Sequence, residues 1–183
     1  MITPNSHWRY AEKDVQSLLA DNRISFGRDG DSQPNLKRFL SEVRDGVKAK
    51  TLWSHKDVGS NDTASREVRE LFSLNRSPMN FPKPTTLIRR VLQLAAQQED
   101  AIVLDFFAGS GTTAHAVMAL NAEDCGCRRY IAVQLPEICS DDSDALAAGF
   151  KTIAEISKER IRRAGKKIKS ENAITAPDLD IGF

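Results

Sequence analysis

The residues of this chain whose types and spacing could support chemistry lie in one run, Asp105-Phe-Phe-Ala-Gly-Ser-Gly-Thr-Thr113. Gly109 and Gly111 lack a Cβ atom, so the backbone there can approach a ligand closely and adopt positive φ. The carboxylate of Asp105 can accept hydrogen bonds from a cationic or hydroxylated ligand. Together these features predict a site for a nucleoside-containing cofactor.

The sequence around this run predicts the elements that position it. The apolar run Ala101-Ile-Val-Leu104 precedes it, and Ala114-His-Ala-Val-Met-Ala-Leu120 follows it. This order is typical of a buried strand, a tight turn and a helix. A second strand is predicted at Arg129-Tyr-Ile-Ala-Val-Gln-Leu135. In an α/β sheet, ligands bind outside the carboxyl ends of the strands, so we expect an α/β fold with the cofactor at that edge.

The glycines alone leave a dinucleotide-dependent oxidoreductase open. Its fingerprint is Gly-x-Gly-x-x-Gly, with an acidic residue about 20 positions further on. Here Ala114 takes the place of the third glycine, the next strand carries Gln134, and Glu137 follows it. The choice of cofactor therefore depends on the residues around the turn.

The run at 105–113 resembles the S-adenosylmethionine loop of amino-methylating DNA methyltransferases, whose pattern is Asp-x-Phe-x-Gly-Ser-Gly-Thr. A second element, Asn80-Phe-Pro-Lys-Pro-Thr-Thr-Leu-Ile-Arg-Arg-Val-Leu92, resembles the segment of these enzymes that closes over the methionine part of the cofactor. The Lys-Pro element precedes the glycine-rich loop, as it does in the β-class arrangement.

Four further stretches resemble the modification subunits of Type III restriction–modification systems: Ile24–Gly30, Pro34–Glu42, Thr51–Trp53 and Ile153–Gly165. The resemblance covers nearly the whole chain. It implies a partial Rossmann-like, S-adenosylmethionine-dependent methyltransferase fold with a mixed N-terminal segment. Residues 1–75 would come from the region between the catalytic and cofactor motifs, and residues 76–183 would form the cofactor-binding part.

The resemblance also assigns site residues. The residues that would hold the cofactor are Lys83, Pro84, Asp105, Phe107, Gly109, Ser110, Gly111, Thr112 and Gln134. Lys83 and Pro84 would close the pocket, and the start of the following helix would bind the methionine carboxylate. Gln134 stands where related enzymes place an acidic residue on the ribose, with Glu137 as a substitute.

The Asp/Asn-Pro-Pro-Tyr element that grips the target amine in these enzymes is absent, because no two prolines in the sequence are adjacent. We therefore assign no catalytic residue. The resemblance implies adenine-N6 methylation of DNA, with the base flipped out and a restriction subunit as partner.

The chain looks like an internal portion, with Asp178–Phe183 resembling a point where the family continues. It is expected to be inactive alone. The alternatives are half of a split enzyme with an N-terminal partner, or a non-catalytic remnant.

Composition limits the other possibilities. The net charge is +1, 28% of residues are charged, and the mean hydropathy is −0.40. We expect a cytoplasmic protein, because no membrane span or signal peptide stands out and an odd number of cysteines argues against a disulfide framework. No metal site is expected, since Cys125 and Cys127 lack a second ligand pair nearby.

The remaining elements are predicted from local patterns. Short helical or loop segments are expected at 11–19 and 35–43, on either side of a turn at 28–31. Asn61–Ser65 is expected to cap a helix at 66–72, and an extended loop at 77–84 leads to a helix at 85–97. The helix at 151–169 is amphipathic, and its basic face is interpreted as solvated, with phosphate contact as the lesser alternative. Trp53 and His115 are expected to serve in packing.

Overall fold

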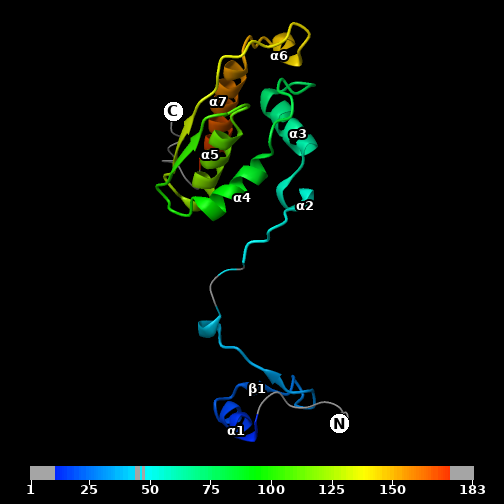
Figure 1. Cartoon of the computed structure of the whole chain (residues 1–183), viewed down its shortest axis with the longest axis vertical. Helices are drawn as coiled ribbons and strands as arrows, with labels where there is room; N and C mark the ends of the chain where they lie inside the picture. Colours follow the sequence, from blue (N-terminus) through cyan, green and yellow to red (C-terminus); the bar gives the residue numbers. More distant parts are fainter. Residues whose placement is uncertain (1–10, 44–45, 47, 174–183) are drawn as a thin grey trace. The chain divides into compact units, whose positions relative to one another are not determined.

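The computed structural model describes residues 11–43, 46 and 48–173 (Figure 1). The chain divides into two compact units, Met1–Lys48 and Ala49–Phe183, and all the predicted site residues belong to the second. The division proposed at residue 75 concerned the origin of the segments and stays a prediction. The stretch Asp178–Phe183 lies outside the described residues.

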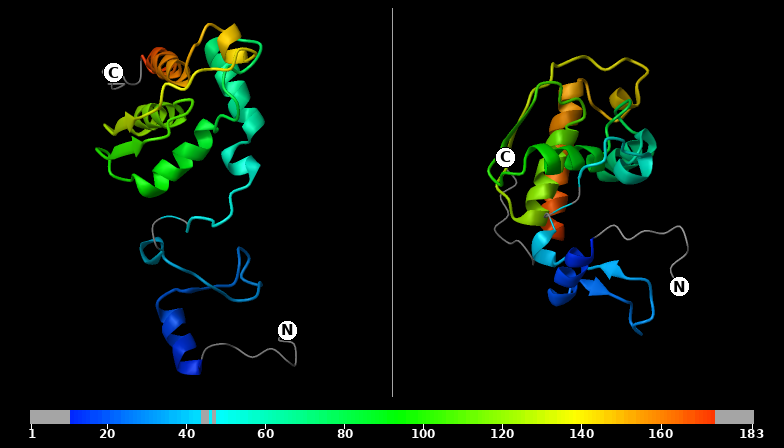
Figure 2. Two further views of the ribbon diagram at one scale, coloured as in Figure 1. Left: turned by 45° about the horizontal axis from the view of Figure 1, so that its top comes forward. Right: turned by 60° about the horizontal axis from the view of Figure 1, so that its bottom comes forward.

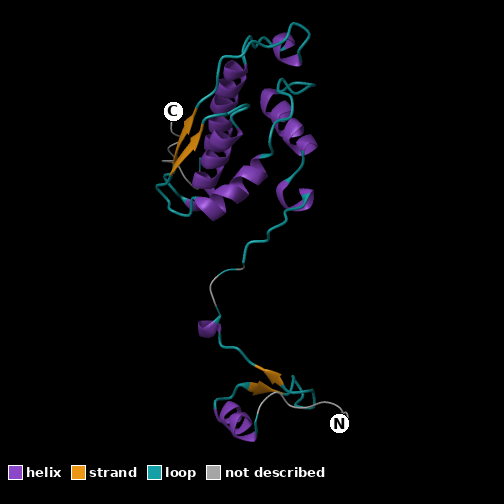
Figure 3. Ribbon diagram, viewed as in Figure 1, coloured by secondary structure: helices purple, strands orange, loops and turns teal. Residues whose placement is uncertain are grey.

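The first unit contains a helix and a small hairpin (Figure 3). Its elements are α1 (Glu12–Ala20), β1 (Ile24–Ser25), β2 (Asn35–Leu36) and the 3₁₀-helix η1 (Leu40–Glu42). The strands pair antiparallel, and the predicted turn at 28–31 lies between them. The prediction of helix or loop at 35–43 was wrong at its start, where the chain forms β2.

The second unit contains the predicted strand–turn–helix order. Its elements are α2 (His55–Val58), α3 (Asn61–Phe72), α4 (Thr85–Ala95), β3 (Ile102–Asp105), α5 (Thr112–Asp124), β4 (Arg129–Ala132), α6 (Asp144–Ala147) and α7 (Ile153–Glu171). The helix predicted at 66–72 begins earlier, because Ser60 caps α3 by accepting a hydrogen bond from the Thr63 N–H. The other predicted elements of this unit are confirmed in position to within a few residues. The strand at 101–104 was predicted to be buried, which is wrong, because the described residues cover only one face of it.

Strands β3 and β4 pair in parallel and are joined through α5. The register places Ile102 opposite Arg129 and Asp105 opposite Ala132, so both carboxyl ends lie at one edge. Helices α4 and α5 pack on one side of this sheet (Figures 1 and 2). The core between them is formed by Leu92, Ala116, Val117 and Leu120, with Val103 and Tyr130 packed against it. The fold is thus α/β around its small parallel sheet.

Helix α7 packs on the side of α5 away from α4 and extends the core to α3. Met118 of α5 contacts a cluster with Ala164 and Ile168 of α7. Ile156 of α7 packs with Val68 of α3 in another cluster. Helix α5 is therefore enclosed between neighbours, which fixes the turn at its N-terminus.

The opposite face of the sheet is apolar and uncovered by the described residues. Ile102 and Leu104 are 57% and 55% exposed, and Ile131 beside them is 53% exposed. Val133 and Leu135 continue this apolar surface beyond β4. Monomeric soluble proteins seldom expose contiguous apolar surface of this kind, so the face has the character of an interface.

The described part of the chain shows no helix long and apolar enough to cross a membrane. Within the same residues there is no group of three or more His, Cys, Asp or Glu side chains placed to hold a metal ion. The three cysteines are free, and burial raises the pKa of Cys139.

His115 of α5 makes the stability of this unit sensitive to acid. Burial, with the nearby charges of Arg160 and Lys167, lowers the pKa of His115 to about 3. In the unfolded chain a histidine titrates at about 6.5. The folded state therefore resists protonation that the unfolded state accepts, and stability is lost as pH falls below about 6.5.

We expect His115→Gln to flatten this dependence. The slope of the unfolding free energy contributed by one such histidine approaches 1.4 kcal/mol per pH unit below about pH 6. Urea unfolding between about pH 7.5 and 5 measures it, and His55→Gln is the matched control because His55 is exposed. Equal slopes for the wild type and His115→Gln would contradict the prediction.

Candidate functional site

The glycine-rich turn is held from within by Asp105, the last residue of β3. One carboxylate oxygen accepts a hydrogen bond from the Phe107 N–H at 3.1 Å, and the other accepts one from the Thr113 hydroxyl at 2.5 Å. The backbone continues the ladder to β4, because the Ala108 N–H donates to the Val133 carbonyl at 3.0 Å. Asp105 therefore orders the turn, and each oxygen keeps a lone pair for a ligand.

Gln134, predicted within the second strand, follows β4 and lies beside the turn. Its side-chain carbonyl oxygen accepts a hydrogen bond from the Gly109 N–H at 2.7 Å. Gly109 has φ +52°, a conformation that L residues seldom adopt. The Gln134 amide therefore fixes the left-handed backbone of the turn, and contact with a ribose stays a prediction.

The structure shows why position 111 requires glycine, which the sequence did not reveal. It caps α5 with φ +75°, and a Cβ atom there would lie 3.0 Å from Ser157 Oγ and 3.1 Å from the Ser157 carbonyl oxygen. Ser157 belongs to α7, so the absence of a side chain at Gly111 lets α7 pack onto the turn. At Gly109 a Cβ atom would meet only ordinary contacts, with Met79 Cε at 3.8 Å.

The hydroxyls of Ser110 and Thr112 point into the protein. Both residues are buried, and their oxygens lie 3.0 Å apart. The Thr112 hydroxyl also donates to the Lys83 carbonyl at 3.2 Å. This bond joins the turn to the Lys-Pro element, so the structure brings together the two motifs that the sequence placed in one site.

Lys83 and Pro84 of the Lys-Pro element directly precede α4. Pro84 is buried at the N-cap position, and Lys83 is exposed. Phe107, the aromatic of the turn, is 83% exposed, and its ring meets Phe106 edge-on with centroids 5.9 Å apart. The exposed edge of the site thus offers an ammonium group and two aromatic faces.

Arg160 of α7 connects the site to the rest of the unit, a role that the sequence did not reveal. Its side chain is fully buried. One terminal nitrogen donates to Ser110 Oγ at 2.9 Å and to Thr112 Oγ1 at 2.8 Å, and the other donates to Thr85 Oγ1 at 3.2 Å. Arg160 therefore joins α7 to the glycine-rich turn and to the first residue of α4.

Glu67 of α3 completes this network. Its carboxylate accepts hydrogen bonds from the N–H and the hydroxyl of Thr85 at 3.0 and 2.8 Å, and lies 3.8 Å from Arg160 Nη2. Burial lowers the pKa of Arg160 to about 10, and Glu67 acts in the opposite direction. The guanidinium therefore remains charged at neutral pH.

The spacing of α7 contained a signal for this arrangement. Arg160 follows Ile156 and precedes Ala164 by one helical repeat of four residues, and all three are buried. It therefore lies within the apolar stripe, and the prediction that the basic side chains of this helix are solvated is wrong for Arg160. Lys158, Arg162 and Lys166 on the other face are exposed.

A hollow of about 380 Å³ lies beside the Lys-Pro element. The extended segment Ser77–Asn80 lines one part of it, and Glu137 and Cys139, which follow β4, line another. Glu137, the substitute acidic residue, thus faces the same hollow as Met79, which lies next to Gly109.

Comparison with known proteins identifies similar chains. A family model described as DNA methylase matches residues 5–166. The chain is 42% identical to the Type III restriction-modification enzyme StyLTI Mod subunit of Salmonella typhimurium, over 98% of this chain and 27% of that protein. It is 34% identical to the EcoP15I Mod subunit of Escherichia coli, over 92% of this chain and 25% of that protein. It is 33% identical to the Type II methyltransferase M.KpnI of Klebsiella pneumoniae, over 63% of this chain and 27% of that protein. The chain thus spans about a quarter of the length of these curated relatives.

Proposed function

This chain belongs to the DNA methylase family, and from that premise we propose that it is the S-adenosylmethionine-binding portion of a site-specific DNA adenine-N6 methyltransferase. The restriction–modification relatives support placing that enzyme in such a system. The observation that carries the proposal is the joining of the glycine-rich turn to the Lys-Pro element through Thr112 and Arg160. A Rossmann-like fold is part of the proposal, supported by the parallel unit from β3 through α5 to β4.

The residues present fit this cofactor. The first turn of α5 has backbone N–H groups without intrahelical partners and the positive end of the helix dipole, which suit the methionine carboxylate. The remaining lone pairs of Asp105 suit an ammonium or hydroxyl donor, and the exposed Phe107 ring offers a surface for the adenine. Lys83 and Pro84 would close over the methionine.

The bound cofactor would supply an activated methyl group on its sulfonium. The residues of this chain would then orient that group and exclude water, which accounts for the lack of a titratable catalytic residue at the turn. The target amine needs a second set of contacts, and the Asp-Pro-Pro-Tyr element that provides them in related enzymes is absent from this sequence. The chain alone is therefore proposed to bind cofactor without transferring the methyl group.

The uncovered face of the sheet supports the proposal that further methyltransferase structure supplies the contacts to the target amine. Ile102, Leu104 and Ile131 form an apolar surface that a larger methyltransferase domain would cover. An N-terminal methyltransferase fragment, DNA and a restriction subunit are the proposed partners. Methylation after mixing with a fragment that carries Asp-Pro-Pro-Tyr would support the split enzyme, and its absence would leave the non-catalytic remnant.

Calorimetric titration of the chain with S-adenosylmethionine tests the proposal. We expect saturable binding that Asp105→Ala weakens at least about tenfold, because the change removes a ligand acceptor and two bonds within the turn. Asp141→Ala is the matched control, since Asp141 is exposed in the loop before α6. NAD serves as the competing ligand.

The outcomes separate the hypotheses. A folded chain that gives no heat with S-adenosylmethionine would contradict the proposed function. Binding of NAD alone would restore the oxidoreductase alternative. Equal weakening by Asp105→Ala and Asp141→Ala would remove the turn from the site.

A further inference from the structure

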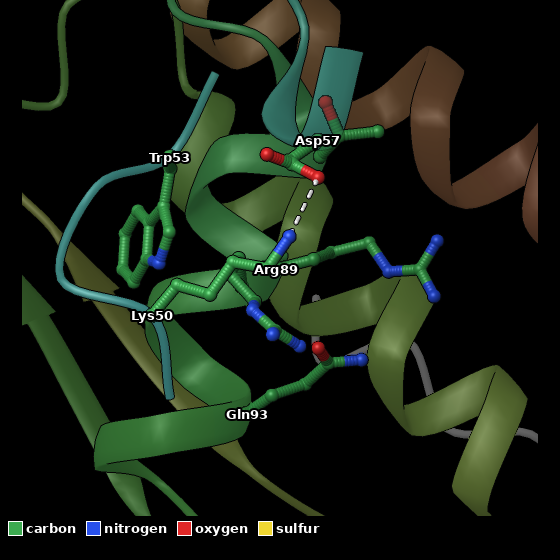
Figure 4. A pocket seen from close by; sticks show the side chains of 7 residues that line it. Lys50, Trp53, Asp57, Arg89 and Gln93 are labelled. Carbon is green, nitrogen blue, oxygen red and sulfur yellow. Dashed lines mark ion pairs between the residues drawn. The ribbon is translucent and has the colours of Figure 1, made fainter. Parts of the chain in front are cut away.

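A hollow of about 370 Å³ lies on a face of α4 that the cofactor motifs do not use (Figure 4). Four of its lining residues recur at helical spacing along α4: Thr86, Arg89, Arg90 and Gln93. The others are Lys50 and Trp53 from the segment before α2, and Asp57 of α2 itself. The volume is within the range of about 300–1,000 Å³ that small-ligand sites occupy.

The charges in this hollow are unbalanced. Lys50, Arg89 and Arg90 line it with one carboxylate, Asp57. Asp57 is engaged at the start of α2, where hydrogen bonds from Ser54 hold its pKa below the usual value. Lys50 Nζ lies 3.8 Å from Asp57, which is a loose contact (Figure 4). The hollow therefore keeps excess positive charge.

Arg90 is the strongest source of that excess. Arg89 is paired with Glu123 of α5. Arg90 is exposed and makes no ion pair within 4 Å among the described residues, although Asp57 is near enough to feel its charge. A guanidinium in this position can bind an oxyanion with two parallel hydrogen bonds.

Two side chains that line the hollow carry buried donors without acceptors among the described residues. Trp53 Nε1 and Arg89 Nε are both shielded from solvent and have no hydrogen-bond partner among the described residues. The indole nitrogen can only donate, so it requires an acceptor oxygen. Buried donors of this kind are usually satisfied. Because both atoms are shielded, an acceptor that enters the hollow would reach them only after a shift of the two side chains. From the sequence, Trp53 was expected to serve in packing alone.

We propose that this hollow binds a backbone phosphate of duplex DNA. The proposal deepens the proposed function and rests on it, because family membership makes DNA the expected source of the phosphate. A phosphodiester supplies both negative charge and acceptor oxygens to the exposed cations Lys50 and Arg90. Such a contact positions the duplex without reading its sequence.

Helix α4 connects the proposed phosphate contact to the Lys-Pro element. Its first residue, Thr85, is held by Arg160 and Glu67 next to the Lys-Pro element. Thr86, the next residue, lines the hollow and donates to the Val58 carbonyl at 2.6 Å. A phosphate bound there would be held by the same rigid helix that begins at the cofactor motif.

The test uses the 183-residue chain with Trp8→Phe, which leaves Trp53 as the remaining tryptophan. Fluorescence anisotropy of a labelled duplex measures affinity, and Trp53 emission reports on the hollow. For the double variant Lys50→Gln/Arg90→Gln, loss of one phosphate contact predicts a salt slope lower by about 0.9 and affinity about eightfold lower at about 0.1 M salt. The matched control Lys166→Gln/Lys169→Gln removes the same charge from the exposed side of α7.

Each alternative outcome overturns the proposal. Equal weakening by the control would show a general charge effect, and unchanged Trp53 emission with bound duplex would place DNA elsewhere. Quenching by inorganic phosphate without any effect of duplex would show a free-anion site, and a chain that binds no duplex would exclude the contact. If S-adenosylmethionine still binds in these cases, only the phosphate site fails; if it does not bind, the proposed function fails by its own measurement.

Discussion

Replacing Arg160 by methionine is expected to lower the free energy of unfolding by about 3–5 kcal/mol, the loss that follows when one partner of a buried charge network is removed. The methylenes of Arg160 are replaced by a side chain of similar length. The hydroxyls of Ser110, Thr112 and Thr85 lose their donor, and Glu67 loses its cation. Burying unpaired polar groups is the physical reason for the effect.

The same substitution is expected to weaken S-adenosylmethionine binding at least about tenfold at a temperature where the variant stays folded, since each 1.4 kcal/mol changes affinity about tenfold. Arg160 does not reach the exposed edge of the site, so it acts through the turn that it positions. Arg160→Lys keeps the charge but cannot serve all three hydroxyl groups with a planar fork, and an intermediate loss is expected.

Urea unfolding and calorimetry measure the two effects separately. Arg162→Met is the matched control, because Arg162 lies on the same helix with an exposed side chain. If Arg160→Met lost stability but kept full affinity for the cofactor, Arg160 would be a purely structural residue. If neither quantity changed, the network would contribute nothing.

Local patterns were sufficient to predict the strand, turn and helix of the site. The apolar run before Asp105 and the apolar helix after Thr113 each fit one element, and the glycines between them allow positive φ at Gly109 and Gly111. These features depend on neighbouring residues, so the sequence alone could reveal them. The hairpin of β1 and β2 was missed because strands of two residues have no alternation to detect.

The network around Arg160 could not be predicted in the same way. It joins positions 67, 85, 110, 112 and 160, which the chain brings together through tertiary packing. The spacing with Ile156 and Ala164 indicates that position 160 is buried, but it does not indicate which groups satisfy the guanidinium. The close packing of α7 on Gly111 could not be predicted either, because Ser157 is remote from Gly111 in sequence.

The sequence of β3 indicates a strand that is covered on both faces, whereas the described residues cover one face. Ile102, Val103 and Leu104 are apolar without alternation, which is typical of a strand covered on both faces. Val103 packs against α4 and α5, whereas Ile102 and Leu104 are exposed. The strand is thus suited to a sheet with a second layer over Ile102 and Leu104.

Gly111→Ala is expected to lower the free energy of unfolding by about 2–5 kcal/mol, as the sum of two effects. A left-handed conformation costs an L residue about 1–2 kcal/mol. Overpacking adds about 1–3 kcal/mol, because the new Cβ atom would lie 3.0 Å from Ser157 Oγ and 3.1 Å from the Ser157 carbonyl oxygen. The carbonyl cannot rotate away without moving α7, so the strain is transmitted to the site.

Gly149→Ala separates the two effects. Gly149 has φ +91°, and a Cβ atom added there would have no neighbouring atom within 4 Å, so its substitution carries the conformational cost alone. Urea unfolding of both variants should therefore show a larger loss for Gly111→Ala, and calorimetry should show weaker S-adenosylmethionine binding for that variant only. Equal losses of stability with unchanged affinity would mean that α7 yields to the new side chain, and that close packing of α7 on the turn is not required by the site.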